Sequence, residues 1–233
     1  MYTKVALLLA LSAQAFSAPV ELEERQSCPK IHIFGARETT ASPGLGSAGT
    51  FVNAILNAYP GSTAEAINYP AAGGTNAAYA SSVQAGVQAV TNQVSAYASK
   101  CPSTQLVLVG YSQGAQIEDD ALCGGGDPNN GVTNTAATIA QYNIKAVIWA
   151  GDPRFTPGET FHVGSATVGG LTAPSFAKRP SAITCGKYQN LIKSYCDASD
   201  PYCSNGNNAA THQGYGNEYG SQALAFVKTK LTA

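Results

Sequence analysis

The stretch QLVLVGYSQGA, residues 105–115, joins an apolar run to a serine that lies between two glycines. A run such as QLVLV is typical of a strand that is buried on both faces of a parallel sheet. Ser112 follows this strand and precedes a predicted helix, and Gly110 and Gly114 would let backbone segments pass close to the turn. In such a nucleophile elbow the serine hydroxyl points into the site, beside a helix N-terminus that favours negative charge. The stretch therefore predicts Ser112 as the nucleophile of an α/β-hydrolase type enzyme.

Strands and helices alternate along the rest of the chain. Apolar residues recur at helical spacing over 79–100, directly before the predicted strand at 105–109. Further strands are predicted at 30–34, 64–69 and 144–150, and further helices around 52–59 and at the C-terminal end. Repeated strand, helix, strand order indicates a three-layer α/β sandwich, with a central parallel sheet between two layers of helices. Segments 124–134 and 154–187 carry no clear pattern of either kind.

The N-terminal residues are typical of an export signal. Lys4 precedes an apolar run over 5–11, and small residues follow it, so we expect residues 1–18 to be a signal peptide. Residues 19–26 are interpreted as a propeptide, and residues 27–233 as a single catalytic domain. No later apolar stretch approaches the roughly 20 residues that a transmembrane helix needs. The sequence thus predicts a secreted, extracellular protein.

The charge of the mature chain is balanced. The full sequence has 13 basic and 14 acidic residues, and removing the predicted leader takes away two basic and three acidic ones, which leaves 11 of each. Without a basic stripe, nucleic acid and anionic membranes are poor partners. The hydrophobic share of 44% is enough for a core that needs no partner chain, so we expect a monomer.

The cysteines indicate disulfides rather than a metal site. All six follow the export signal, and an even number in an oxidising compartment predicts three disulfides. Three histidines are scattered, and no CxxC or HExxH spacing occurs, so we expect no metal. The cysteines are Cys28, Cys101, Cys123, Cys185, Cys196 and Cys203.

A serine nucleophile needs a base, which in this fold follows the serine and an acid along the chain. His32 precedes Ser112 and lies in a predicted strand, so it is interpreted as a structural side chain. His162 has no well-placed carboxylate before it. His212, in NAATHQGYG, is predicted to lie in a loop just ahead of the last helix, where such folds present their base. We therefore expect His212 to be the base.

Three aspartates, Asp152, Asp197 and Asp200, lie between the serine and this histidine, and spacing alone does not choose among them. Asp152 stands in the turn GDP, which favours a turn or capping role. Asp200 stands in CDASDPYC, where a bridge between the flanking cysteines would hold its loop still.

The chain from Ser27 onward resembles the fungal acetylxylan esterases of the cutinase-like carbohydrate esterase group, and more distantly cutinase. The resemblance rests on SCPKIHIFGARETT, YPGSTAEAINYP, LVLVGYSQG, ALCGGGDPN, KSYCDASDPYC and ATHQGYGNEYGSQALAFV. It implies a cutinase-like α/β-hydrolase fold. It also implies that Ser112, Asp200 and His212 form a catalytic triad, with an oxyanion hole made by Thr39 and the backbone N–H of Gln113.

The same resemblance implies a disulfide pattern. This chain departs from its relatives at Ser204, where they carry a second consecutive cysteine, and at 73–79, which lacks a cysteine pair. Losses in matched pairs leave three bridges. The pairs implied are Cys28 with Cys101, Cys196 with Cys203, and Cys123 with Cys185.

The expected reaction is deacetylation of acetylated xylan through an acetyl-serine intermediate, with no cofactor. Two alternatives remain at this point: cutinase-like hydrolysis of longer aliphatic esters, and a non-catalytic carbohydrate-binding protein on the same fold. The predicted site is flanked by polar residues and by Tyr202 and Tyr215, which could stack against a sugar ring. These flanks favour an acetylated polysaccharide as the substrate.

Overall fold

The computed structural model describes residues 28–133, 136–169 and 185–232. The predicted signal peptide (1–18) and the predicted propeptide (19–26) lie outside the described residues, as does residue 27. The strands are β1 Ile31–Ala36, β2 Thr63–Ala66, β3 Gln105–Tyr111, β4 Ile144–Ala150, β5 His162–Val163 and β6 Ile192–Tyr195. The α-helices are α1 Gly49–Ala58, α2 Asn76–Lys100, α3 Gln113–Cys123 and α4 Ala209–Lys228. Among the helices of these segments, none has both the length and the apolar character needed to cross a membrane.

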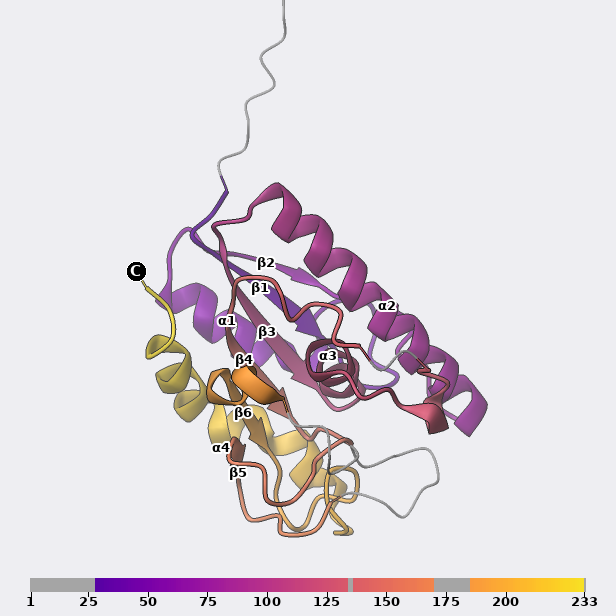
Figure 1. Ribbon diagram of the computed structural model, residues 1–233. Coiled ribbons are helices and arrows are strands. Elements are labelled where there is room, and N and C mark those ends of the chain that lie inside the picture. Colours follow the sequence, from indigo (N-terminus) through magenta and orange to yellow (C-terminus); the bar gives the residue numbers. More distant parts are fainter. Residues whose placement is uncertain (1–27, 134–135, 170–184, 233) are drawn as a thin grey trace, which may run out of the picture.

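The six strands form one sheet in the order β2-β1-β3-β4-β6-β5, and every neighbouring pair is parallel. Helices α2 and α3 pack together on one face, and α1 and α4 pack together on the other (Figure 1). Strand β3, at the centre, is buried along its whole length. The predicted three-layer α/β sandwich with a parallel sheet is therefore confirmed.

Local predictions differ from the structure in three places. Strand β2 ends at Ala66, earlier than the predicted 64–69. Strands β5 and β6 were not predicted, because each is too short to carry a periodic pattern. The prediction that His212 lies in a loop ahead of the last helix is wrong, since α4 begins at Ala209. Asn208 caps this helix by accepting a hydrogen bond from the N–H of Ala210, so His212 stands in the first turn.

Helix α3, which follows Ser112, is buried almost all round although it reads QGAQIEDDALC. Asp120 of this helix is paired with a cation inside the fold, because the buried guanidinium of Arg154 lies 3.1 Å from it. The same guanidinium lies 3.4 Å from Asp127, which follows the helix. Glu118 accepts a hydrogen bond from the indole of Trp149, and burial raises the pKa of Glu118 well above its usual range. These contacts let a polar helix fill the space beneath the nucleophile.

The three disulfides that the resemblance implied are confirmed. Cys28–Cys101 ties the start of β1 to the end of α2, and Cys196–Cys203 closes a loop with a sequence separation of 7. Cys123–Cys185 joins the end of α3 to the segment before β6.

Replacing Arg154 by methionine keeps most of the side-chain volume but leaves the two buried carboxylates of Asp120 and Asp127 without their cation. We expect the free energy of unfolding to fall by about 3–5 kcal/mol, as for other buried ion pairs that lose one partner. Denaturant unfolding followed by circular dichroism measures this loss. The exposed Lys100→Met, at the end of α2, is the control and should change stability by less than about 0.5 kcal/mol. Equal stabilities for the two variants would contradict the structural role of the Arg154 cluster.

Candidate active site

Ser112 lies between β3 and α3 in a backbone conformation that side-chain-bearing residues rarely adopt, with φ 53° and ψ −122°. Both flanking glycines are needed for this turn. A Cβ atom on Gly114 would lie 2.1 Å from the carbonyl oxygen of Ala36, and one on Gly110 would lie 2.5 Å from the Cα of Ala115. The predicted nucleophile elbow is therefore present, and Ser112, directly before α3, lines a cavity.

His212 and Asp200 form the strongest polar contact beside this serine. The distance from Nδ1 of His212 to Oδ2 of Asp200 is 2.7 Å, and the Asp200 side chain is fully buried. The other oxygen, Oδ1, accepts hydrogen bonds from the backbone N–H groups of Tyr202 and Cys203. Burial alone would raise the pKa of Asp200, but these bonds and the neighbouring imidazole outweigh it and hold the pKa below its ordinary value. Asp200 is thus a carboxylate that can orient His212.

The other two aspartates are occupied elsewhere. Asp152 accepts a hydrogen bond from the backbone N–H two residues on, which matches its predicted turn role. Asp197 accepts from the hydroxyl groups of Ser165 and Tyr219. Geometry therefore selects Asp200 as the partner of His212.

The remaining histidines have structural contacts. The ring of His32 stacks on Tyr97 at 3.7 Å, and its Nδ1 lies 2.6 Å from the hydroxyl of Thr63. Burial lowers the pKa of His32 to about 4, so its ring is neutral near pH 7. His162 lies in β5, where its Nε2 is 3.1 Å from Glu159. Neither ring lines the cavity beside Ser112.

Thr39 lies in the loop that follows β1 and lines the same cavity. The loop is held by the buried side chain of Arg37, which donates hydrogen bonds to the carbonyl oxygens of Ala41, Ile67 and Tyr69. The cation is balanced by backbone dipoles here, and its guanidinium also lies 4.9 Å from the ring of Tyr69. A fixed loop is what a preorganised hydrogen-bond donor at Thr39 would require.

Gln113 is the first residue of α3, so its backbone N–H has no acceptor within the helix. Its buried side chain donates to the carbonyl of Ala72 and accepts a hydrogen bond from Ser82 of α2. Contacts outside the cavity therefore fix both predicted oxyanion residues, Thr39 through its loop and Gln113 through its side chain.

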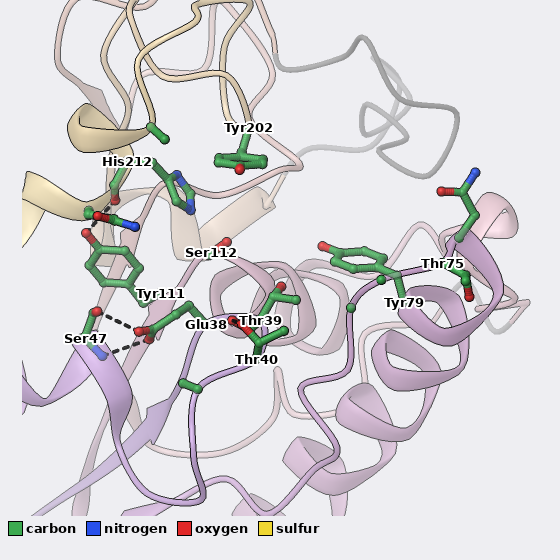
Figure 2. A pocket seen from close by; sticks show the side chains of 16 residues that line it. Glu38, Thr39, Thr40, Ser47, Thr75, Tyr79, Tyr111, Ser112, Tyr202 and His212 are labelled. Atoms are coloured by element: carbon green, nitrogen blue, oxygen red, sulfur yellow. Dashed lines mark hydrogen bonds between the residues drawn. The ribbon is translucent and has the colours of Figure 1, made fainter.

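The cavity has a volume of about 760 Å³, which is within the range of small-molecule sites. Figure 2 shows Ser112, His212 and Tyr202 at one end of it, with Thr39 and Thr40 along one side and Tyr79 farther along. Polar side chains, glycines and tyrosines dominate the walls, and none of the lining residues described is Leu, Ile, Val, Phe or Met. The lining residues are Glu38, Thr39, Thr40, Ala41, Ser47, Gly73, Gly74, Thr75, Asn76, Tyr79, Tyr111, Ser112, Tyr202, Ala209, His212 and Gln213.

One group of residues in the described part of the chain has side-chain atoms close enough to share a metal ion: Asp119, Cys123 and Cys185. The two sulfurs of this group are joined in a disulfide, so they offer no thiolate to a metal. This group also stands apart from the residues that line the cavity.

Comparison with known proteins agrees with this geometry. The family model described as Cutinase matches residues 27–231. The chain belongs to the cutinase family. Within that family it is 59% identical to acetylxylan esterase 2 of Talaromyces purpureogenus, over 97% of both chains. It is also 54% identical to cutinase 11 of Verticillium dahliae, over 97% of this chain and 77% of that one.

A solved structure supports the same placement within the cutinase family. An acetylxylan esterase structure at 0.90 Å resolution superimposes with a TM-score of 0.83 and is 60% identical in sequence. The match covers 88% of this chain and all of the other. The overall fold therefore agrees with that of a cutinase-family serine esterase.

The two tyrosines that were expected to contact a sugar differ in their exposure to the cavity of this cutinase-family site. Tyr202 is 39% exposed, lines the cavity, and has its ring 4.5 Å from that of His212, so it remains a candidate for sugar contact. Tyr215 is only 1% exposed and does not line the cavity. The expectation that Tyr215 stacks against a sugar is wrong, because its hydroxyl points inward and donates to Asp200 at 2.8 Å.

Two positions beside His212 were missed by sequence reasoning. The hydroxyl of Tyr111, next to the nucleophile, donates to the carbonyl oxygen of His212 at 2.6 Å. Gly151 follows β4 with φ 63°, and a Cβ there would lie 2.5 Å from Cε1 and 2.7 Å from Nδ1 of His212. A turn such as GDP carries no sign of this contact, because the helix that supplies the histidine is remote in sequence.

We expect Gly151→Ala to displace the imidazole of His212 and to lower kcat/KM by about a hundred-fold, the cost of a displacement of about 1 Å at a catalytic group. Gly61→Ala is the matched control. Its φ is also positive, at 86°, but a Cβ there would meet nothing within 4 Å, so it should lose stability and keep activity. Steady-state ester hydrolysis and thermal unfolding of both variants test this. Equal activities would show that Gly151 does not make room for the imidazole.

Proposed function

We propose that the protein is a secreted, monomeric serine esterase that removes acetyl groups from acetylated xylan. The observation that carries the proposal is the hydrogen-bonded pair of His212 and Asp200 beside Ser112, at one end of a polar cavity. The similarity to acetylxylan esterase 2 of Talaromyces purpureogenus, over nearly the whole chain, supports the choice of substrate. Residues 1–26 would be removed during export.

The reaction would begin with attack of Ser112 Oγ on the acetyl carbonyl carbon, while Nε2 of His212 takes the hydroxyl proton. Asp200, bonded to Nδ1, holds the imidazole in the required tautomer and stabilises the imidazolium that forms. Collapse of the tetrahedral intermediate breaks the ester bond, and His212 returns the proton to the sugar oxygen. Water, deprotonated by His212, then attacks the acetyl-serine carbonyl, and His212 passes that proton to Ser112 Oγ as the ester bond breaks and acetate leaves. Each step moves protons and acyl groups between these side chains and the substrate, and no redox partner is required.

The negative charge on the carbonyl oxygen would be stabilised by Thr39 and by the backbone N–H of Gln113. A preorganised donor of this kind lowers the barrier by about 3–4 kcal/mol. The N-terminus of α3 adds a favourable dipole at the same place. The Arg37 contacts, which hold the Thr39 loop, keep one donor in place before the substrate arrives.

The wall of the cavity favours acetylated carbohydrate over long aliphatic esters. A cutinase-like site for an extended acyl chain needs large aliphatic side chains, whereas none of the described lining residues is Leu, Ile, Val, Phe or Met. Tyr202 is exposed beside His212, where a ring can pack against the face of a sugar. Such a wall offers hydroxyl-bearing polymers hydrogen bonds as well as stacking.

A non-catalytic carbohydrate-binding protein would need the cavity but not the elbow. The φ of 53° at Ser112 costs about 1–3 kcal/mol, and two buried hydrogen bonds fix Asp200 Oδ1 in addition to the bond to His212. These features have a purpose in acyl transfer and none in sugar binding, so they favour the enzyme.

Acetate release from acetylated xylan by the purified mature chain tests the proposal. We expect steady release by the wild type and a loss of about ten thousand-fold or more in Ser112→Ala, because the residual rate then comes from binding and the oxyanion hole. If neither protein hydrolysed any ester tested, the result would favour the binding-protein alternative.

Acyl-chain preference separates the two esterase alternatives. With p-nitrophenyl esters, we expect kcat/KM to fall from acetate to butyrate and further to octanoate, since each methylene changes transition-state binding by about 1–3 kcal/mol. The described cavity wall has no large aliphatic side chain that could bind the added methylene groups of a longer acyl chain. A preference for octanoate, without acetate release from xylan, would assign the protein to cutinase-like hydrolysis.

A further inference from the structure

The hydroxyl of Tyr215 lies at the centre of the buried contacts behind His212. It donates a hydrogen bond to Oδ2 of Asp200 at 2.8 Å and accepts one from the backbone N–H of Asp197 at 2.9 Å. The acceptor Oδ2 is the same oxygen that His212 contacts at 2.7 Å. One carboxylate oxygen therefore receives two side-chain donors, one from the base and one from a residue that no catalytic step uses.

Helix α4 supplies these donors from one face. His212, Tyr215 and Tyr219 are three and four positions apart, which places them on the same side of the helix. Tyr215 binds Asp200, and Tyr219, one turn farther on, donates to both oxygens of Asp197 at 3.0 Å. The loop that the Cys196–Cys203 disulfide closes is thus bonded to α4 at two carboxylates.

We propose that Tyr215 is a positioning residue for acyl transfer, whose hydroxyl aligns Oδ2 of Asp200 with Nδ1 of His212 and disperses the negative charge on that oxygen. This role rests on the proposed esterase function, since it concerns the same base. It goes beyond the triad because Tyr215 touches neither the cavity nor the reacting atoms.

The hydroxyl stays a donor at the pH where the enzyme would work. Burial, followed by the charge of Asp200, raises the pKa of Tyr215 far above its ordinary value. Its bond to Asp200 is among the contacts that hold the pKa of that carboxyl low. The ionised carboxylate and the protonated phenol are therefore complementary between the ordinary pKa values of an aspartate and a tyrosine.

Other polar groups face this pair from the surrounding elements. Asp197 approaches from the disulfide-closed loop through its N–H, and Tyr202 of the same loop has its ring 4.5 Å from that of His212. Tyr111 of β3 bonds the carbonyl of His212, and Glu38 lies across the cavity in the loop after β1. The side-chain bond from the Tyr215 hydroxyl to Oδ2 of Asp200 is the contact that substitution of Tyr215 removes.

Tyr215→Phe removes the hydroxyl and keeps the ring. We expect kcat for p-nitrophenyl acetate to fall about ten-fold with little change in KM, because Oδ2 loses the bond that fixes its direction. The acid limb of the kcat/KM profile should move to higher pH by about half a unit. Without the phenol, the charge on Oδ2 attracts the proton on His212 more strongly, so the base is protonated at higher pH.

Tyr219→Phe is the matched control, since it removes an equivalent hydroxyl from the same helix and its bond to the same loop. It should lose comparable stability but keep the wild-type pH profile, with kcat within about two-fold. Identical profiles and rates for the two variants would overturn the positioning role and leave Tyr215 as a packing residue.

A second measurement keeps the proposal testable where Tyr215→Phe fails to fold. Replacing Tyr215 alone by 3-fluorotyrosine strengthens the hydroxyl as a donor, and we expect the acid limb to move to lower pH, opposite to the phenylalanine variant. The downfield proton resonance of His212 Nδ1–H should shift in the same sample, and this signal needs no substrate. An unchanged resonance and limb would contradict the proposal, whereas absence of turnover in the wild type would contradict the esterase function instead.

Discussion

The site depends on the backbone turn at Ser112, which is possible only because two neighbouring positions lack side chains. Gly114 meets the carbonyl of Ala36 at the end of β1, and Gly110 meets the first turn of α3. A Cβ at either position would push the helix away from the sheet and release the strained φ of Ser112. Helix α3, which follows this turn, is buried. Of its acidic residues, Asp120 is paired with Arg154, and Glu118 accepts a hydrogen bond from Trp149.

His212 and Asp200, the proposed base and its acid, are brought to this turn from the far end of the chain by a different set of contacts. The first turn of α4 carries His212, and the loop closed by the Cys196–Cys203 disulfide carries Asp200. Tyr111, adjacent to the nucleophile, bonds the backbone of His212, so the elbow and the base are linked directly. The relative positions of Ser112, Asp200 and His212 thus depend on short, buried hydrogen bonds.

The sequence was sufficient to predict the sheet and the elbow, because these follow from long apolar runs and glycine spacing. Chain order selected His212, whose imidazole contacts Asp200, as the proposed base. The sequence alone could not decide between Asp197 and Asp200 as the partner of His212 without the family resemblance. The two residues lie in one loop, and only the direction of their side chains distinguishes them. Sequence reasoning misplaced Tyr215, because aromatic residues near a site can face a ligand or the core. The i, i+3 spacing of His212 and Tyr215 was the available sign, and it becomes informative only once α4 is known to begin at Ala209.

The burial of the polar helix α3 and the roles of Arg154 and Gly151 could not be predicted either, since each depends on a partner that is distant in the chain.

The central claim of the proposed function is that Ser112 is the nucleophile. Inactivation by an alkyl phosphonate ester, followed by peptide mass spectrometry, tests it most directly. We predict one phosphonyl group per chain, on the peptide that contains Ser112, with loss of activity in proportion to labelling. Complete inactivation with the label on another residue, or full labelling of Ser112 with activity retained, would contradict the account.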